Sequence, residues 1–411
     1  MRYWMQSSLA RTLFLGLTLA SCSAAPSSEA QGRKSSGKPF VVTPLATFEE
    51  PFAMAFLPDG SALVTEKAGH LKVWRQGQAP AEVLGAPAVE AGGQGGLLDV
   101  AVSPSFATDH GVYLTYSEPN AAGGSGLALA RATLGLDGAR LRLSGLRVLW
   151  HDPQGGEGGQ LGAAIAFAPD GQSLFLSSGE RQRFTPAQDP SQPLGKILHL
   201  TLDGQPAPGN PMAGKLGATT TMVTSPPANT GAAKSAKGRA FTWPGPNRTP
   251  AETWSSGHRN PYGLVFDADG RLWETEMGPK GGDELNLIRP GRNYGWPLAS
   301  NGSNYDGGDI PDHKPGDGFE APRLWWNPSI SPGGLMIYRG AKWPQWKGDA
   351  FLPALSAQAL VRVHLAGENA TKADQWDMGN RVRAVAQSPD GDIYLLEDGS
   401  GARLLRLDKA N

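Results

Sequence analysis

The sequence lacks several features that mark disulfide-rich, nucleic-acid-binding or membrane-spanning proteins. Its 411 residues include one cysteine, Cys22, so no disulfide can form within the chain. Lysine and arginine number 37 against 38 aspartates and glutamates, so we expect no nucleic-acid partner. The apolar run TLFLGLTLA at 12–20 is shorter than the roughly 20 residues that cross a bilayer. What remains is a chain long enough to bury a large core.

The N-terminus has the pattern of a secretory signal. Arg2 and Arg11 precede the apolar run, which ends in Leu19-Ala20-Ser21-Cys22. That ending resembles the bacterial lipobox, in which the cysteine is lipidated; an ordinary cleaved signal is the alternative. We predict a signal peptide with a lipobox at 1–22 and a flexible tether at 23–41. The expected location is the bacterial cell envelope, at the outer membrane facing the periplasm, with a lipid anchor at Cys22 as the only membrane attachment.

Short apolar strands separated by tight turns recur along the rest of the chain. The composition favours many short elements, with 55 glycines and 34 prolines. Six similar stretches run from about residue 50 to 408, as in AAIAFAPDGQSLFLSSGE, which begins at Ala163. A β-sandwich with coincidental hairpins is the alternative, but six units predict an all-β, six-bladed β-propeller over 42–409. Four units carry a hairpin-closing Asp-Gly: Asp59-Gly60, Asp170-Gly171, Asp269-Gly270 and Asp390-Gly391.

One long gap interrupts the series between the third and fourth units. It contains GKLGATTTMVTSPPANTGAAKSAKGRA at 214–240, which is rich in alanine, threonine, glycine and serine and has little to bury. We predict a mobile, low-complexity surface insertion near 205–250.

The densest group of polar residues is SSGHRNPYGLVFDADGRLWETEMGPKGGDELNLIRPGRNYGWP at 255–297. It combines an Arg-Asn pair, a Gly-Pro turn and Asp283-Glu284. Carboxylate and carbonyl oxygens around a glycine-rich turn suit Ca²⁺. Taken alone, Asp283 and Glu284 are more often a solvated pair than metal ligands.

This segment resembles the soluble PQQ-dependent glucose dehydrogenase and aldose sugar dehydrogenase family, also called the glucose/sorbosone dehydrogenase family. HRNPYGLVF, EMGPKGGDELN and NYGWP are the most specific pieces, and GGQGGLLDVAVSPSF, WNPSISPGGLMIYRG and RVRAVAQSPDGDIYLLED extend the match over almost all of 42–408. The resemblance implies a six-bladed propeller that oxidises a small sugar or aldehyde with PQQ and Ca²⁺.

The resemblance also implies which residues contact the cofactor. Arg259 and Asn260 match residues that contact the carboxylates and carbonyls of PQQ, and the guanidinium fork suits a carboxylate. Arg381 and Arg383 match two further arginines near the cofactor. Without the resemblance, Arg381 and Arg383 would be interpreted as the outward-facing residues of a strand whose valines face inward.

Two Ca²⁺ sites follow from the same resemblance. The carbonyls of Gly278 and Pro279 match the ligands of the catalytic Ca²⁺. Asp283 and Glu284 match a separate structural Ca²⁺ site, to which Tyr294 is adjacent.

The family's catalytic histidine is missing. In the family this histidine takes a proton from the sugar, and aligning GAAIAF without a gap places Gln160 there, beside a family glutamine matched by Gln94. Glutamine cannot act as a general base. His151 is nine residues upstream, and Glu180 either substitutes as the base or is an ordinary loop carboxylate. Ser356 stands where the family has a cofactor-binding lysine, so PQQ binding is itself in question.

Two functions follow from these residues. One is a PQQ- and Ca²⁺-dependent sugar or aldehyde dehydrogenase in which Gln160 replaces the histidine. The other is a non-catalytic, lipid-anchored propeller that binds a sugar, a quinone or an envelope protein. The electron acceptor and the oligomeric state stay open.

Overall fold

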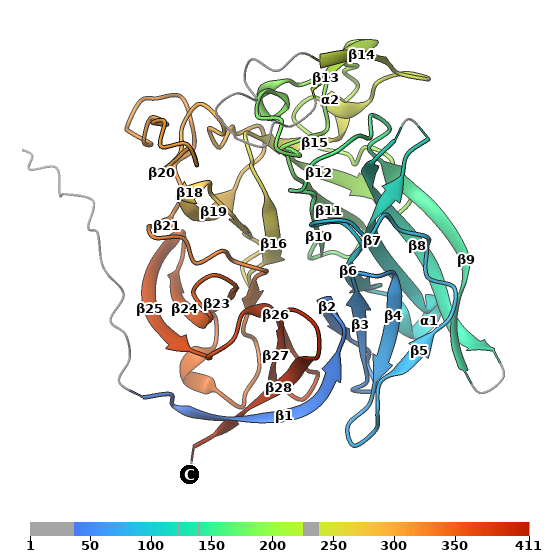
Figure 1. The fold of residues 1–411 in the computed structure, drawn as a ribbon, viewed down its shortest axis with the longest axis vertical. Helices are drawn as coiled ribbons and strands as arrows, with labels where there is room; N and C mark the ends of the chain where they lie inside the picture. Colours follow the sequence, from blue (N-terminus) through green and yellow to red (C-terminus); the bar gives the residue numbers. More distant parts are fainter. Residues whose placement is uncertain (1–36, 122, 138–139, 225–237, 411) are drawn as a thin grey trace, which may run out of the picture. The chain divides into compact units, whose positions relative to one another are not determined.

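The computed structural model describes residues 37–410, apart from 122, 138–139 and 225–237. Cys22, the signal peptide and most of the expected tether therefore lie outside the described residues. Within the described part, six four-stranded antiparallel sheets follow one another along the chain. Figure 1 shows them in a ring, with β2, β6, β10, β16 and β26 nearest the middle. The predicted six-bladed β-propeller is confirmed.

Each blade runs from an inner to an outer strand. The blades are, in order, β2 (Pro51–Phe56), β3 (Ala62–Glu66), β4 (His70–Trp74) and β5 (Ala81–Val83); β6 (Leu97–Val102), β7 (Gly111–Pro119), β8 (Ser125–Asp137) and β9 (Arg140–His151); β10 (Gly162–Phe167), β11 (Ser173–Ser178), β12 (Lys196–Thr201) and β15 (Thr253–Ser256); β16 (Pro261–Phe266), β17 (Leu272–Glu276), β19 (Asp283–Ile288) and β21 (Leu324–Trp326); β22 (Met336–Ile337), β23 (Ala350–Ala354), β24 (Ala359–Ala366) and β25 (Asn369–Asp377); and β26 (Val382–Gln387), β27 (Ile393–Glu397), β28 (Ala402–Lys409) and β1 (Phe40–Phe48).

The sixth blade joins the two ends of the fold. Its outer strand β1 comes first in the described chain and pairs antiparallel with β28, from Phe40 opposite Lys409 to Phe48 opposite Ala402. The ring of Phe40 also packs edge-on against Trp376, with 5.2 Å between the ring centroids. Blade 6 therefore closes the ring by main-chain hydrogen bonds and by aromatic packing.

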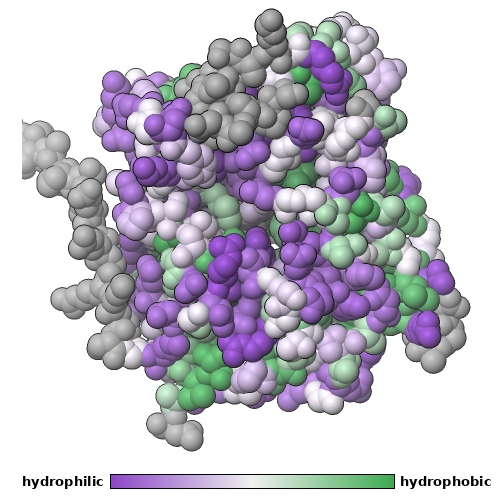
Figure 2. All heavy atoms as spheres, viewed as in Figure 1, coloured by the Kyte–Doolittle hydropathy of each residue, from purple (hydrophilic) through white to green (hydrophobic). Residues whose placement is uncertain are grey.

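The Asp-Gly turns lie where the sequence predicts them, between the first and second strands of four blades. Their glycines have positive φ angles of 83°, 69°, 81° and 86°, which a side chain would disfavour. Apolar residues of facing sheets fill the space between blades; Leu63, Leu114 and Leu176 are fully buried in one such cluster. Hydrophilic residues predominate around the middle of the face in Figure 2.

The insertion contains more regular structure than the sequence analysis predicts. β13 (Thr220–Thr224) and β14 (Gly238–Thr242) form an antiparallel hairpin, because the run TTMVT is rich in β-branched residues. Residues 225–237 between them lie outside the described part.

The remaining elements are small. They are β18 (Lys280–Gly281), β20 (Gly302–Ser303), α1 (Phe106–Asp109), α2 (Thr249–Glu252) and the 3₁₀ turns Thr185–Gln188 and Pro344–Trp346. Among the described residues, no helix is long and apolar enough to cross a membrane.

Candidate active site

Loops that lead into three neighbouring inner strands bring most of the expected site residues together. Gln94 precedes β6, Gln160 precedes β10, and Arg259 and Asn260 precede β16. These strands are neighbours in the ring. Asn260 joins two of the loops, because its Oδ1 accepts a hydrogen bond from the backbone of Gly162 at 3.2 Å. Residues far apart in sequence thus form one buried polar cluster.

Gln160 lies at the centre of this cluster and is almost fully buried. Its backbone N–H donates to Oε1 of Gln94 at 2.6 Å, and the same oxygen accepts from the Tyr262 hydroxyl at 3.2 Å. Its side-chain amide fits between two opposite charges. With the amide oriented so that both neighbours are satisfied, the NH₂ group donates to Glu180 and the oxygen accepts from Nη2 of Arg259 at 2.7 Å. Gln160 therefore acts as a bridge between a carboxylate and a guanidinium.

Glu180 is fully buried beneath the Gln160 amide. Its carboxylate accepts hydrogen bonds from the backbone N–H groups of Gln182, at 3.0 Å, and Phe184. Burial raises the pKa of Glu180, an effect that the nearby charge of Arg259 opposes. A carboxylate enclosed by three donors orients its neighbours and does not reach a substrate directly. The geometry therefore favours the ordinary loop carboxylate over a substitute base.

The Arg259 side chain contacts two backbone carbonyls and two aromatic rings of the site. Its Nη1 donates to the carbonyls of Met277, at 2.8 Å, and Gly278, at 2.6 Å. Its guanidinium lies over the rings of Trp296 and Tyr305, at 5.2 and 5.9 Å from their centroids. Its Nε is buried and has no hydrogen-bond partner among the described residues. A buried donor without a partner costs free energy, so this atom is suited to an anionic group of a ligand.

The Gly-Pro turn expected to hold the catalytic Ca²⁺ follows β17. Gly278 and Pro279 are both buried. Asp283 fixes this turn, because its Oδ1 accepts from the Gly278 N–H at 2.9 Å and from the Ser329 hydroxyl at 3.0 Å. Its Oδ2 accepts from the N–H groups of Ile330 and Ser331 at 2.7 and 2.6 Å. Asp283 thus ties the turn to the loop before β22.

A second acidic group lies below the turn, on one face of β17 and β19. Glu276 is directly opposite Glu284 across the two strands, and Glu274 is opposite Asn286. The Asn286 NH₂ group donates to all three carboxylates at 3.0–3.3 Å. Burial, then the charge of Glu276, raises the pKa of both Glu274 and Glu284 well above 4.5. These like charges require a proton or a cation as compensation.

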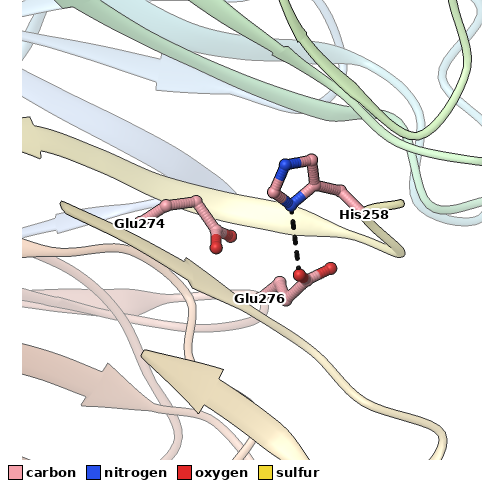
Figure 3. Close-up of side chains that lie close together, drawn as sticks. All are labelled: His258, Glu274 and Glu276. Atoms are coloured by element: carbon pink, nitrogen blue, oxygen red, sulfur yellow. Dashed lines mark hydrogen bonds and ion pairs between the residues drawn. The ribbon is translucent and has the colours of Figure 1, made fainter. Parts of the chain in front are cut away.

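A histidine borders this acidic group. His258 Nδ1 lies 3.3 Å from Oε1 of Glu276, and Figure 3 shows Glu274 on the other side of the same space. Its ring stacks on Tyr294 at 4.7 Å. A cavity of about 10 Å³, enough for one water or ion, is lined by Glu276, Glu284, Tyr294 and Gly278. The two carboxylates in its wall suit the hard cation expected there, while the Arg259 side chain also lines the cavity.

Arg381 directly precedes β26 and is exposed, whereas Arg383 lies on the strand and connects to the site through aromatic rings. Arg381 and Arg383 both bind the Asp398 carboxylate, at 2.7 and 2.9 Å. Arg383 also lies 5.2 Å from the ring centroid of Phe52, which packs edge-on against Tyr262 at 5.6 Å. Tyr262 in turn binds Gln94. The pattern with valine inside also holds, because Val382 is fully buried.

Two other expected positions lie apart from the Gln160 cluster. The Ser356 hydroxyl is exposed and donates to the Ser329 carbonyl at 3.1 Å. His151 ends the outer strand β9, where its ring pairs with Glu118 at 2.8 Å. The glycine-rich loop therefore does not bring His151 to Gln160.

Sequence reasoning missed Arg181 and Arg183, which lie under the loop that carries Gln160. Both are almost fully buried. The only signal in the sequence is the repeated arginine of SSGERQRF after Glu180.

Known proteins share this fold and these motifs. A family model described as glucose/sorbosone dehydrogenase matches residues 48–226 and 237–406. An aldose sugar dehydrogenase of Escherichia coli is 34% identical over 372 residues, covering 88% of this chain and 91% of the relative. The apo crystal structure of the soluble aldose sugar dehydrogenase from Escherichia coli has a TM-score of 0.77 and 32% identity, with 90% of this chain and all of the other covered.

A further similar structure is the PQQ-bound form of an aldose sugar dehydrogenase from Streptomyces coelicolor. It has a TM-score of 0.67 and 27% identity, covering 90% of this chain and 98% of the other. The family model and the relatives at this coverage agree with the expectation from the motifs. The chain belongs to the glucose/sorbosone dehydrogenase family, whose named members are sugar-dehydrogenase oxidoreductases.

Proposed function

We propose that this protein oxidises an aldose or a related aldehyde in a PQQ- and Ca²⁺-dependent reaction. The observation that carries the proposal is Arg259, a buried guanidinium that lies over two aromatic rings and keeps Nε unpaired. A planar tricarboxylate such as PQQ matches a donor of this kind. PQQ would serve as the hydride acceptor, and a relative solved in its PQQ-bound form supports this choice.

The residues expected to hold Ca²⁺ offer suitable oxygen donors. The Gly278 carbonyl lies beside Arg259, and Glu284 lines the small cavity below the turn. Carbonyl and carboxylate oxygens are the ligands that Ca²⁺ prefers. We propose Gly278 and Pro279 for the cation nearest the cofactor. Asp283, Glu284 and Tyr294 are proposed for a structural cation, with Asp283 acting through its hydrogen bonds.

In this proposal Gln160 positions the sugar and does not take its proton. The amide is fixed by Glu180 and Arg259, so it can present a hydrogen-bonding edge but no basic lone pair. Loss of a general base typically costs about 10²- to 10⁴-fold in rate. We therefore expect slow turnover.

Binding of the cofactor tests the proposal directly. Purified protein is titrated with PQQ by calorimetry, with and without Ca²⁺, and sugar-dependent reduction of an artificial electron acceptor is then measured. We expect Ca²⁺-dependent binding that Arg259→Lys weakens by at least about tenfold, because lysine cannot form the guanidinium fork. Arg147→Lys, an exposed residue paired with Asp203, is the matched control and should bind as the wild type does. Absence of PQQ binding by the wild type would overturn the proposal.

A second function has its own support. Gln160 has no basic group, and the cationic contact expected at position 356 is replaced by a neutral hydroxyl bound to Ser329. These features suit a propeller that binds a sugar, a quinone or an envelope protein without turnover. In the same experiment, PQQ or sugar binding without acceptor reduction would support this function and contradict the first.

The cellular setting is also a proposal. Cys22 and the signal lie outside the described residues, so the lipid anchor, the outer-membrane location facing the periplasm and the unidentified electron acceptor rest on the sequence alone. Radiolabelled palmitate incorporation that is lost in Cys22→Ser would support the anchor.

A further inference from the structure

The loop before Gln160 is held by side chains of one short segment. Residues 155–159 contain four glycines and no apolar side chain that could anchor them. Gly155, Gly156 and Gly158 have positive φ angles of 55°, 103° and 113°. A Cβ atom on Gly156 would lie 2.7 Å from Nη2 of Arg183. The positive φ of Gly156, together with this close approach, favours glycine at the position.

Arg181 and Arg183 bind the carbonyl groups of this loop. Arg181 donates to the carbonyls of Gly156 and Gly158 at 3.1 and 2.8 Å, and also to that of Ser125 at 2.9 Å. Arg183 donates from one nitrogen to the carbonyls of Gly155 and Glu157 at 2.8 and 3.0 Å. The four consecutive carbonyl groups of residues 155–158 thus accept hydrogen bonds from two guanidinium groups.

The residues between and before the arginines complete the contact. The Gln182 side chain accepts from the Gly159 N–H at 3.2 Å. The Arg181 N–H donates to the Gln160 carbonyl at 3.2 Å. Glu180 holds the Gln160 side chain. The whole Glu180–Arg183 segment therefore packs on the loop, and each of its residues contacts it through a different group.

The contact between the Glu180–Arg183 segment and the loop requires strained backbone conformations and a buried positive charge. Arg181 and Gln182 have φ angles of 61° and 60°, and Gln160 itself has a φ of 57°. Left-handed conformations of such residues persist only where surrounding structure imposes them, and they cluster at functional sites. Burial also lowers the pKa of Arg181 to about 10, so the fold places a cation where water cannot solvate it. The buried Asp152 supplies a compensating charge.

We propose that Arg181 and Arg183 are positioning residues that fix the 155–160 loop and thereby the orientation of the Gln160 amide at the substrate. The arginines do not touch the reacting atoms; they act through the loop. A displacement of about 1 Å in a positioned group can cost about a hundredfold in rate. The catalytic part of this inference rests on the proposed sugar oxidation, while the structural part stands alone.

The test combines amide hydrogen exchange with kinetics in the full-length protein. Arg183→Lys and Arg181→Lys keep the positive charge but cannot bridge two carbonyls. We expect exchange of the Gly159 and Gln160 amides, which donate to Gln182 and Gln94, to become at least about tenfold faster in each variant, while the core strands stay protected. With D-glucose and an artificial acceptor, kcat should fall by about 10- to 100-fold and KM should stay within about threefold. Arg147→Lys is the matched control.

Each outcome decides part of the proposal. Unchanged exchange in a folded variant, or an unchanged kcat, would overturn it. If the variants do not fold, exchange in the wild type decides: a fixed loop requires protection of the hydrogen-bonded Gly159 and Gln160 amides comparable to that of β10, and rapid exchange there contradicts the proposal. If the wild type binds no PQQ and shows no turnover, the proposed oxidation fails, while the exchange result still tests the fixed loop.

Discussion

Gln160 has a side chain held from opposite sides by a carboxylate and a guanidinium. A histidine at this position would meet the same two neighbours. One ring nitrogen could donate to Glu180, as the amide does, and the other would face Arg259 with a basic lone pair that glutamine lacks. The residues around position 160 could therefore hold a histidine as a general base, although the protein has glutamine there.

Replacing Gln160 with histidine should therefore increase turnover. We expect Gln160→His to raise kcat for an aldose by about 10- to 100-fold, since a positioned general base contributes about 10²- to 10⁴-fold. Steady-state kinetics of the PQQ- and Ca²⁺-loaded protein would measure the change. Gln160→Ala, which removes the bridge without adding a base, is the control and should not be faster than the wild type. A histidine variant no faster than the alanine variant would show that proton removal does not limit this protein.

Asp99, on the inner strand β6, connects two blades. Its Oδ2 accepts from the Ile165 N–H of β10 at 2.8 Å, and its Oδ1 accepts from the Val100 N–H at 2.8 Å. Burial raises its pKa from 3.8 to about 7. Between these two values the folded chain keeps a proton that the unfolded chain has released. Asp99 therefore favours the folded state at low pH, and this contribution is lost as the pH rises towards 7.

The pH dependence of stability tests this assignment. The free energy of unfolding, measured with denaturant at pH 5, 6, 7 and 8, should fall more steeply in the wild type than in Asp99→Asn, whose side chain does not titrate. The variant should be less stable at pH 5, because its NH₂ group faces one of the two backbone donors. Parallel curves for the two proteins would mean that Asp99 titrates in the folded state as it does in the unfolded chain.

At the level of elements, the blades differ in how well their strands could be predicted. The inner two strands of each blade are buried and apolar and often joined by Asp-Gly, so they are readily recognised. Outer strands such as β25, with the sequence NATKADQWD, have no clear alternation, because pairing with β24 decides their conformation. The β13–β14 hairpin escaped prediction because its β-branched run TTMVT lies within a segment rich in alanine, glycine and serine.

The site residues also divide into those that could be predicted from the sequence and those that could not. Gln160, Arg259 and Asn260 could be placed from motifs, and the structure brings them together. Arg181 and Arg183 could not, because their partners are backbone carbonyls, which every sequence contains. Only the folded loop shows which carbonyls need a donor.

At the scale of the whole molecule, ring closure depends on the pairing of β1 with β28. Removing residues 1–49 should lower Tm by about 10 °C or more, since it exposes the edge of β28 and removes Phe40 from its contact with Trp376. Removing residues 1–36, which leaves β1 in place, is the reference for this comparison. Thermal unfolding followed by circular dichroism would measure both. Equal melting temperatures for the two truncations would contradict a closing role for β1.

The same pairing sets the order of events during synthesis. Thr43 binds Asp408 across 365 positions of sequence, so blade 6 cannot form until residue 408 has left the ribosome. Contacts so distant in sequence slow folding. Until then the growing chain carries unpaired strands that are prone to aggregate. A chaperone that binds extended chains would therefore stay bound until β28 has been made, and Ala402–Lys409 would control its release.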